Sequence, residues 1–78
     1  MNDYIGRENA GFTIVLAIPV KESVFVLAHN ARNRVSPWVT WHANSPTDYN
    51  YGHYFANASN AYRDLYRRAA AWAEVVYA

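Results

Sequence analysis

Two short apolar runs in the first third of the chain have the composition of β-strands. Residues 12–18 (FTIVLAI) and 24–29 (VFVLAH) are rich in β-branched and aromatic side chains, which is typical of strands. Residues 20–23 (VKES) between them predict a turn, so the two runs form an antiparallel hairpin. Pro19 cannot donate a ladder hydrogen bond, and it therefore ends the first strand or places it at a sheet edge. Both runs are apolar on both faces, so the hairpin is either covered on both sides or forms an interface.

Two further segments predict a second hairpin. Residues 38–42 (WVTWH) and 49–55 (YNYGHYF) are rich in aromatic side chains, and residues 44–48 (NSPTD) between them favour a turn. We expect Gly52 to mark a bulge or a close approach of another group.

The register of this second hairpin determines which rings share a face. We start from a pairing of Ala43 with Tyr49. Continued along both strands, it sets these neighbours: Trp41 opposite Tyr51, Val39 opposite His53, and Trp38 beside Tyr54 on the other face. A slip of one residue would exchange the two faces.

From Asn57 onward the apolar residues recur with helical spacing. Asn57 is a favourable N-cap residue, and Asp64 and Arg68 are spaced for an i,i+4 ion pair. Tyr62, Tyr66 and Ala73 flank the apolar stripe, and Arg63, Arg67 and Glu74 face away from it. The stripe itself consists of Ala58, Ala61, Leu65, Ala69, Trp72 and Val76.

These elements predict an α+β fold in one small domain over residues 1–78. We expect a four-stranded antiparallel sheet of two hairpins, with one long C-terminal helix packed on one face. Residues 1–11 are polar and mixed, with Gly6 and Gly11 as breakers, so we expect a flexible or irregular lead-in there. A single helix covers only one face of a sheet, and we therefore expect the other face to be open to a partner or a second copy.

Composition excludes several classes of protein. Seven Lys and Arg against six Asp and Glu give a net charge of +1, which is too small for a strongly basic nucleic-acid binder or an acidic nucleic-acid mimic. Without Cys there is no disulfide framework, no Cys-ligated zinc and no thiol nucleophile. The longest apolar run, residues 12–20, is far shorter than the about 20 residues of a membrane helix. We expect a soluble cytoplasmic protein without a signal peptide or membrane contact.

Residues capable of catalysis or metal binding form no recognised motif. His29, His42 and His53 lack the spacing of a metal site, and Asp48 is the only acid near them in the sequence. Serine elbows, paired carboxylates and phosphate-binding glycine loops are also missing from the sequence. We therefore predict no catalytic residue, no metal and no cofactor, and we interpret the histidines as ordinary strand residues.

Aromatic residues and arginines gather in the second hairpin and the loop before it. Trp, Tyr and Arg dominate protein–protein hot spots, and rings beside guanidinium groups also bind single-stranded nucleic acid. The nearly neutral charge favours a protein partner, either a host protein or a second copy of the chain, with single-stranded nucleic acid as the alternative. The predicted binding residues are Arg32, Arg34, Trp38, Trp41, Tyr49, Tyr51 and Tyr54.

Three segments carry a resemblance to small uncharacterised sheet-plus-helix proteins encoded by phages and mobile elements of bacteria. They are residues 37–41 (PWVTW), 51–55 (YGHYF) and the helical stretch 61–69, and the similarity spans residues 24–70. Such proteins often bind and block a host protein, as anti-CRISPR and other anti-defence inhibitors do, so the resemblance implies an inhibitor. Those inhibitors are commonly acidic, and this chain is not, which counts against mimicry of DNA.

Overall fold

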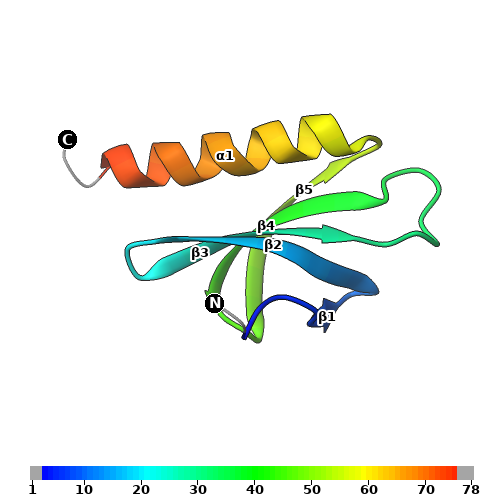
Figure 1. Ribbon diagram of the computed structural model, residues 1–78, viewed down its shortest axis with the longest axis horizontal. Coiled ribbons are helices and arrows are strands. Elements are labelled where there is room, and N and C mark those ends of the chain that lie inside the picture. The colour runs from blue at the N-terminus through cyan, green and yellow to red at the C-terminus, as the bar shows by residue number, and fades with distance from the viewer. Residues whose placement is uncertain (1–2, 76–78) are drawn as a thin grey trace.

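Five antiparallel strands and one helix make up the fold, which a computed structural model describes over residues 3–75 (Figure 1). The strands lie side by side in chain order, and the helix follows the last of them. They are β1 (Glu8–Asn9), β2 (Phe12–Val20), β3 (Ser23–His29), β4 (Trp38–Ser45), β5 (Asp48–Phe55) and α1 (Ala58–Val75). The predicted α+β class, both hairpins and the C-terminal helix are confirmed, whereas the predicted number of four strands is wrong by one. Within residues 3–75, no helix has the length and apolar character needed to cross a membrane.

The extra strand is β1, in the segment that was expected to be irregular. Ala10 and Gly11 both have positive φ, 53° and 86°, which is the backbone of a tight hairpin turn. The turn pairs Glu8 with Thr13, and Ile14 exchanges hydrogen bonds with Gly6 and Arg7 at 2.8 and 2.9 Å. Of the flexible or irregular lead-in expected over residues 1–11, residues 3–6 form turns and residues 8–11 form β1 and its hairpin turn, while residues 1–2 lie outside the described part.

β2 is a sheet edge along most of its length. Beyond Phe12 and Thr13, which pair with β1, and Ile14, which bonds to Gly6 and Arg7, its neighbouring strand within residues 3–75 is β3. Pro19 lies in this edge stretch, as predicted, where its missing N–H interrupts no second ladder. The turn of the following hairpin joins Val20 to Ser23, with Lys21 at a φ of 60°.

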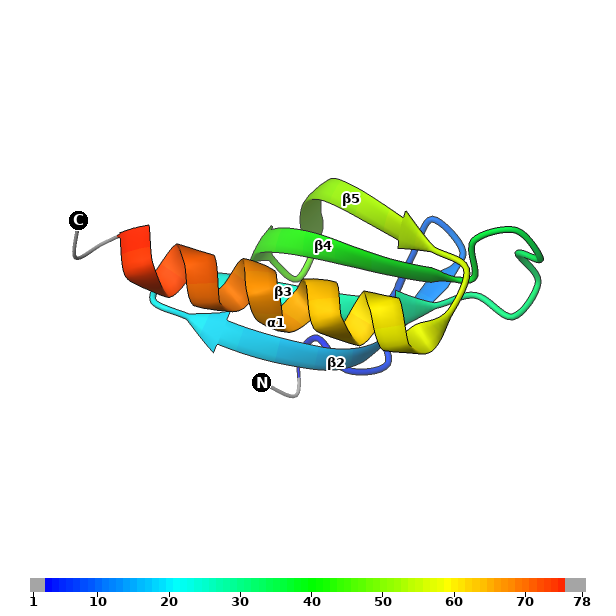
Figure 2. The ribbon, with the colours of Figure 1, turned by 90° about the horizontal axis from the view of Figure 1, so that it is seen from above.

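α1 covers one face of the sheet. It runs along β3, with β2 on one side and β4 and β5 on the other (Figure 2). Asn57 caps it through a hydrogen bond of 3.0 Å from the Asn60 amide to Oδ1. The residues buried between helix and sheet are Phe25, Leu27, Ala61, Leu65 and Ala69. Small alanines at two of these positions let the helix approach the strands closely.

Most of the predicted helical pattern is confirmed. Arg63, Arg67 and Glu74 are exposed, and Ala58 is half-buried. Trp72 belongs to the predicted stripe but keeps 38% of its surface exposed, because it lies toward the end of the helix. Val76 lies outside the described residues.

The other face of the sheet is not open, because the sheet curls around it. Phe12 in β2 lies 5.8 Å from Trp41 in β4 and 5.9 Å from Tyr54 in β5, measured between ring centroids. β2 and β5 are three strand spacings apart, about 14 Å in a flat sheet. Contact between their rings therefore requires strong curvature.

The N-terminal segment completes the cover of this curled face. β1 and the chain before it lie on the side of the sheet opposite α1 (Figure 1), and Tyr4 is only 7% exposed within the same cluster. Val26 and Val39 are fully buried there, and Trp41 is 4% exposed. The expectation that this face is open to a partner is therefore wrong.

A bulge in β5 sets the register of the second hairpin. Ala43 pairs with Tyr49 as predicted, but Thr40 pairs with His53, so β5 holds an extra residue around Tyr51 and Gly52. Tyr51 adopts a φ of 55° there. A Cβ on Gly52 would lie 2.9 Å from Trp41 Nε1. Both alternatives predicted for Gly52, a bulge and a close approach, are confirmed.

The same bulge overturns the remaining predicted pairs. Val39 pairs with Tyr54 and Trp38 with Phe55, so the pairings of Trp41 with Tyr51 and of Val39 with His53 are wrong. Trp38 packs on the helix side, while Tyr54 contacts Phe12 on the curled side. The predicted meeting of Trp38 with Tyr54 is therefore wrong as well.

Candidate binding groove

An aromatic groove lies between the C-terminal half of α1 and strands β3 to β5. Its volume is about 680 Å³. Among the described residues, its lining includes a single charged side chain, that of Arg68, and no carboxylate. The lining residues are Phe25, His42, Asn44, Tyr51, Arg68, Ala71 and Trp72, and we call this set the aromatic groove.

Stacked rings form the strand-side wall of the aromatic groove. The His42 ring stacks on Phe25 at 4.9 Å and faces Tyr51 at 6.3 Å, with interplanar angles of 21° and 25°. Trp72 meets the His42 ring from the helix at 4.9 Å and a 56° tilt. Tyr51 remains 75% exposed. Since each ring contacts the next, the wall presents a continuous aromatic surface.

The bulge is what brings Tyr51 to this wall. Side chains alternate between faces along a strand, and an inserted residue reverses that alternation. Tyr49 accordingly contacts Trp41 on the curled side, while His53 contacts Asp64 of the helix. Tyr51 lies at the switch and faces His42.

Ser23 and Trp72 extend the groove toward the β2–β3 turn. Ser23 Oγ and His42 Nε2 share a hydrogen bond of 2.9 Å, which fixes the orientation of the imidazole. A neighbouring hollow of about 400 Å³ is lined by Lys21, Glu22, Ser23 and Trp72. Trp72 therefore divides two hollows and presents ring surface to both.

A buried polar network joins β4 to α1 beside the groove. Thr40, which is fully buried, donates its hydroxyl hydrogen to Asp64 Oδ2 at 2.6 Å. Nη1 of Arg68 donates to the Thr40 hydroxyl at 3.0 Å and to its carbonyl oxygen at 3.1 Å. His53 Nδ1 and the same Asp64 oxygen share a hydrogen bond of 3.0 Å. The Thr40 hydroxyl and Asp64 Oδ2 therefore both have hydrogen-bond partners, as buried polar atoms require.

Asp64 and Arg68 therefore do not form the direct i,i+4 ion pair that their spacing predicts. The Thr40 hydroxyl lies between them and bonds to both. A hydroxyl buried under a helix needs a donor and an acceptor, and these two side chains are the ones within reach.

Arg68 is desolvated where it enters the groove. Burial lowers the pKa of Arg68, and the negative charge of Asp64 opposes that shift. The guanidinium lies 5.8 Å from the centre of the Phe25 ring. Its hydrogen bonds to the described residues all come from Nη1. The N–H groups of Nε and Nη2 therefore have no hydrogen-bond partner among the described residues, and Arg68 lines the groove.

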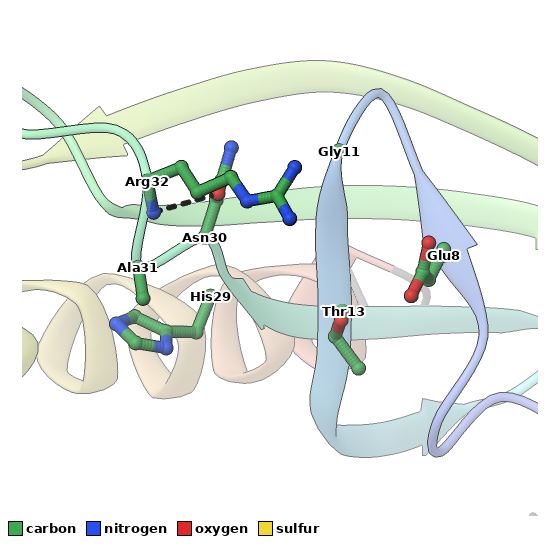
Figure 3. Close-up of a pocket in the computed structure, with 7 residues that line it drawn as sticks. All are labelled: Glu8, Gly11, Thr13, His29, Asn30, Ala31 and Arg32. Carbon is green, nitrogen blue, oxygen red and sulfur yellow. Dashed lines mark hydrogen bonds between the residues drawn. The ribbon is translucent and has the colours of Figure 1, made fainter.

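A third hollow, of about 470 Å³, lies beside the loop that connects β3 to β4. Asn30 Oδ1 accepts a hydrogen bond of 3.0 Å from the Arg32 amide and shapes the start of this loop. The Arg32 side chain reaches toward Gly11, while Glu8 lies on the far side of β2 (Figure 3). Thr13, His29 and Ala31 complete the lining. With one acid and one base at its rim, this hollow has no net charge preference.

The predicted binding residues are distributed over three separate surfaces. Arg32 and Arg34 are exposed on the β3–β4 loop, and Trp38 is half-buried against His29, with 4.2 Å between ring centroids. Trp41 and Tyr49 belong to the cluster under the curled face, and Tyr54 is exposed at its border. Only Tyr51 lines the aromatic groove.

The remaining groove residues were not predicted as a site. Phe25 and Trp72 have the spacing of core positions, and His42 has that of an ordinary strand residue. Only the approach of α1 to β4 and β5 brings them to Arg68. The one local signal was Gly52, whose bulge turns Tyr51 toward the helix side.

Metal ligands do not gather anywhere in residues 3–75: no group of three or more His, Cys, Asp or Glu could hold an ion. His42 and His53 have separate partners, Ser23 and Asp64. Comparison of the chain with family models, with curated proteins and with solved structures finds no match.

Proposed function

We propose that this protein is a non-enzymatic protein-interaction module and that the aromatic groove is its contact surface. One observation carries the proposal: the exposed rings of Tyr51 and Trp72 line the same groove as the half-buried Arg68. Tyr, Trp and Arg are the residues that contribute most to binding at protein interfaces. Both rings already contact the His42 ring, which reduces the conformational entropy that would be lost when a partner orders them.

The distribution of charge supports a protein partner over single-stranded nucleic acid. A nucleic-acid strand brings one phosphate per nucleotide and is bound along a track of cations. Arg68 is the one cation in the groove lining within the described residues. Arg63 and Arg67 lie on the exposed part of α1, outside that lining.

Site-specific photo-crosslinking tests the proposal with a matched pair of positions. Ala71 lines the groove, whereas its neighbour Ala70 is exposed and outside it. A photoreactive phenylalanine at position 71 should crosslink a partner in host lysate, and the same residue at position 70 should not. Trp72→Ala should abolish the crosslink from position 71, while Tyr66→Ala, which removes an exposed ring elsewhere on the helix, should leave it. Equal crosslinking from both positions would contradict the assignment of the groove.

The identity of the captured species separates the finer alternatives. A crosslinked dimer of the chain, with a matching mass by light scattering, assigns the groove to self-association. A captured host protein allows the inhibitor role implied by the sequence resemblance to be measured, by adding the purified module to an assay of that protein. Full activity of the saturated partner would remove the inhibitor role and leave the binding function.

A further inference from the structure

Arg68 is a cation in an apolar setting with unused hydrogen-bond donors. Thr40 engages only Nη1, so the side of the guanidinium formed by Nε and Nη2 has no partner among the described residues. A guanidinium offers two parallel N–H groups along that side, which match the two oxygens of a carboxylate. Desolvation strengthens such a contact because water competes less for the charge.

Two nearby carboxylates accept hydrogen bonds from other groups, and a third, that of Glu22, lines the neighbouring hollow. Asp64 Oδ2 accepts from Thr40 and pairs with His53. The two oxygens of Asp48 accept from the amides of Asn44 and Asn50, at 3.2 and 3.0 Å. None of these acids lines the groove, so the charged side chain that a ligand in the groove would meet is Arg68.

We propose that the groove binds an acidic aromatic segment of a partner protein, with Arg68 holding a side-chain carboxylate of Asp or Glu. A neighbouring flat side chain lies against the rings of Tyr51 and Trp72, which are the exposed parts of the wall. The inference rests on the proposed function, because it names the chemistry that the same groove selects.

A second copy of this chain fits the groove poorly. Its acids stand next to an aromatic residue at Asp3–Tyr4 and Asp48–Tyr49. Tyr4 is buried in its own core, and the Tyr49 hydroxyl is buried beneath the curled sheet. Presenting either segment to another molecule would require unfolding part of the domain, so a separate protein is the better source.

Titration of the ¹⁵N-labelled chain with two blocked peptides tests the inference. The acidic peptide is acetyl-Gly-Glu-Tyr-Glu-Gly-amide, and its control carries Gln in place of both Glu. We expect the acidic peptide to shift the Arg68 Nε–H and Trp72 indole N–H resonances. The Gln peptide should bind at least about tenfold more weakly than the acidic peptide, since it lacks the charge-assisted contact.

Two arginine variants and one ring variant assign the contact. Arg68→Gln should reduce binding of the acidic peptide to the level of the Gln peptide. Arg67→Gln makes the same charge change outside the groove and should leave binding unchanged. Because Arg68→Gln also removes bonds to Thr40, Tyr51→Ala provides a variant that keeps Arg68 in place, and it should weaken both peptides alike.

Each other outcome overturns the inference in a recognisable way. Equal binding of the two peptides, both lost in Trp72→Ala, would remove the carboxylate contact and leave the proposed function intact. No shift of the Arg68 and Trp72 resonances at about 5 mM acidic peptide, a range that detects weak contacts, would reject the partner chemistry. Shifts with oligothymidylate that vanish at high salt would replace the protein partner with nucleic acid and overturn the proposed function as well.

Discussion

A single guanidinium nitrogen joins Arg68 to Thr40: Nη1 donates both to the Thr40 carbonyl oxygen, at 3.1 Å, and to its hydroxyl, at 3.0 Å. The Thr40 hydroxyl in turn donates a hydrogen bond to Asp64 Oδ2. One buried side chain on the sheet therefore positions an acid and a base on successive turns of the helix. It also ties α1 to β4 and leaves Nε and Nη2 of Arg68 without a hydrogen-bond partner among the described residues.

Thr40→Val should destabilise the protein. The substitution keeps the side-chain shape but removes the group that donates to Asp64 and accepts from Arg68, which leaves buried partners unsatisfied. We expect the free energy of unfolding to fall by about 1–3 kcal/mol, measured by urea denaturation. Thr40→Ser retains the hydroxyl and should lose distinctly less. Equal losses for the two variants would show that packing of the methyl group matters more than the hydrogen bonds.

Tyr49→Phe should cost no stability at neutral pH. The Tyr49 hydroxyl is buried, and it has no hydrogen-bond partner among the described residues. Removing an unsatisfied buried hydroxyl relieves its desolvation penalty, so the free energy of unfolding should stay the same or rise. A loss of more than about 1 kcal/mol in urea denaturation would show that the hydroxyl has a partner after all.

Tyr49 should also make stability fall at alkaline pH. Burial raises the pKa of Tyr49, and Arg7 only partly opposes the shift. The Tyr49 phenol of the unfolded chain therefore ionises at a lower pH than that of the folded protein. Its ionisation leaves the free energy of unfolding unchanged below the ordinary pKa near 10. The free energy of unfolding then falls as the pH rises through the higher pKa of the folded state. Denaturation above pH 10 should therefore show a steeper loss in the wild type than in Tyr49→Phe. Parallel curves would contradict burial of the phenol.

Gly52→Ala should disturb the bulge. The new Cβ would lie 2.9 Å from Trp41 Nε1 and from a ring carbon of Tyr54, so one of these buried or packed rings must move. We expect a loss of about 1–3 kcal/mol, together with a change in the near-ultraviolet circular dichroism of the tryptophans. Gly6→Ala is a useful comparison, since its Cβ meets no atom within 4 Å and only the positive φ of 89° opposes it. It should lower stability without changing the aromatic signal.

Local chemistry made the elements of this fold predictable, whereas their curvature and the groove were not. Asn57 marks the start of the helix by its capping chemistry, and Pro19 marks an edge because it lacks an N–H. Gly52 predicts the bulge, but the predicted pairing assumes regular alternation and therefore sets Trp38 and Tyr54 on one face, whereas Trp38 pairs with Phe55. Sequence periodicity assumes regular alternation, and one inserted residue reverses it.

The predicted binding set failed to form one surface for a related reason. Rings such as Trp41 and Tyr51 look alike in a sequence, yet the first fills the curled core and the second lines the groove. Whether a ring is core or contact depends on how strongly the sheet curls, which involves contacts between strands that are not neighbours. Arg68 likewise gains its role only from Thr40, which lies 28 residues away in the chain.

Tyr4 is the most direct test of how the curled face is closed. It comes from the segment before β1 and is buried with Phe12 and Trp41, so it replaces the partner that an open sheet face would need. Tyr4→Ala should lower the free energy of unfolding by about 2–4 kcal/mol, as expected for loss of a large buried ring, and should increase binding of a hydrophobic dye. Ile5→Ala, which shortens an exposed neighbour, is the control and should change neither. If Tyr4→Ala unfolds at the same urea concentration as the wild type, the N-terminal segment does not cover this face in solution, and the rings beneath it become available to a partner.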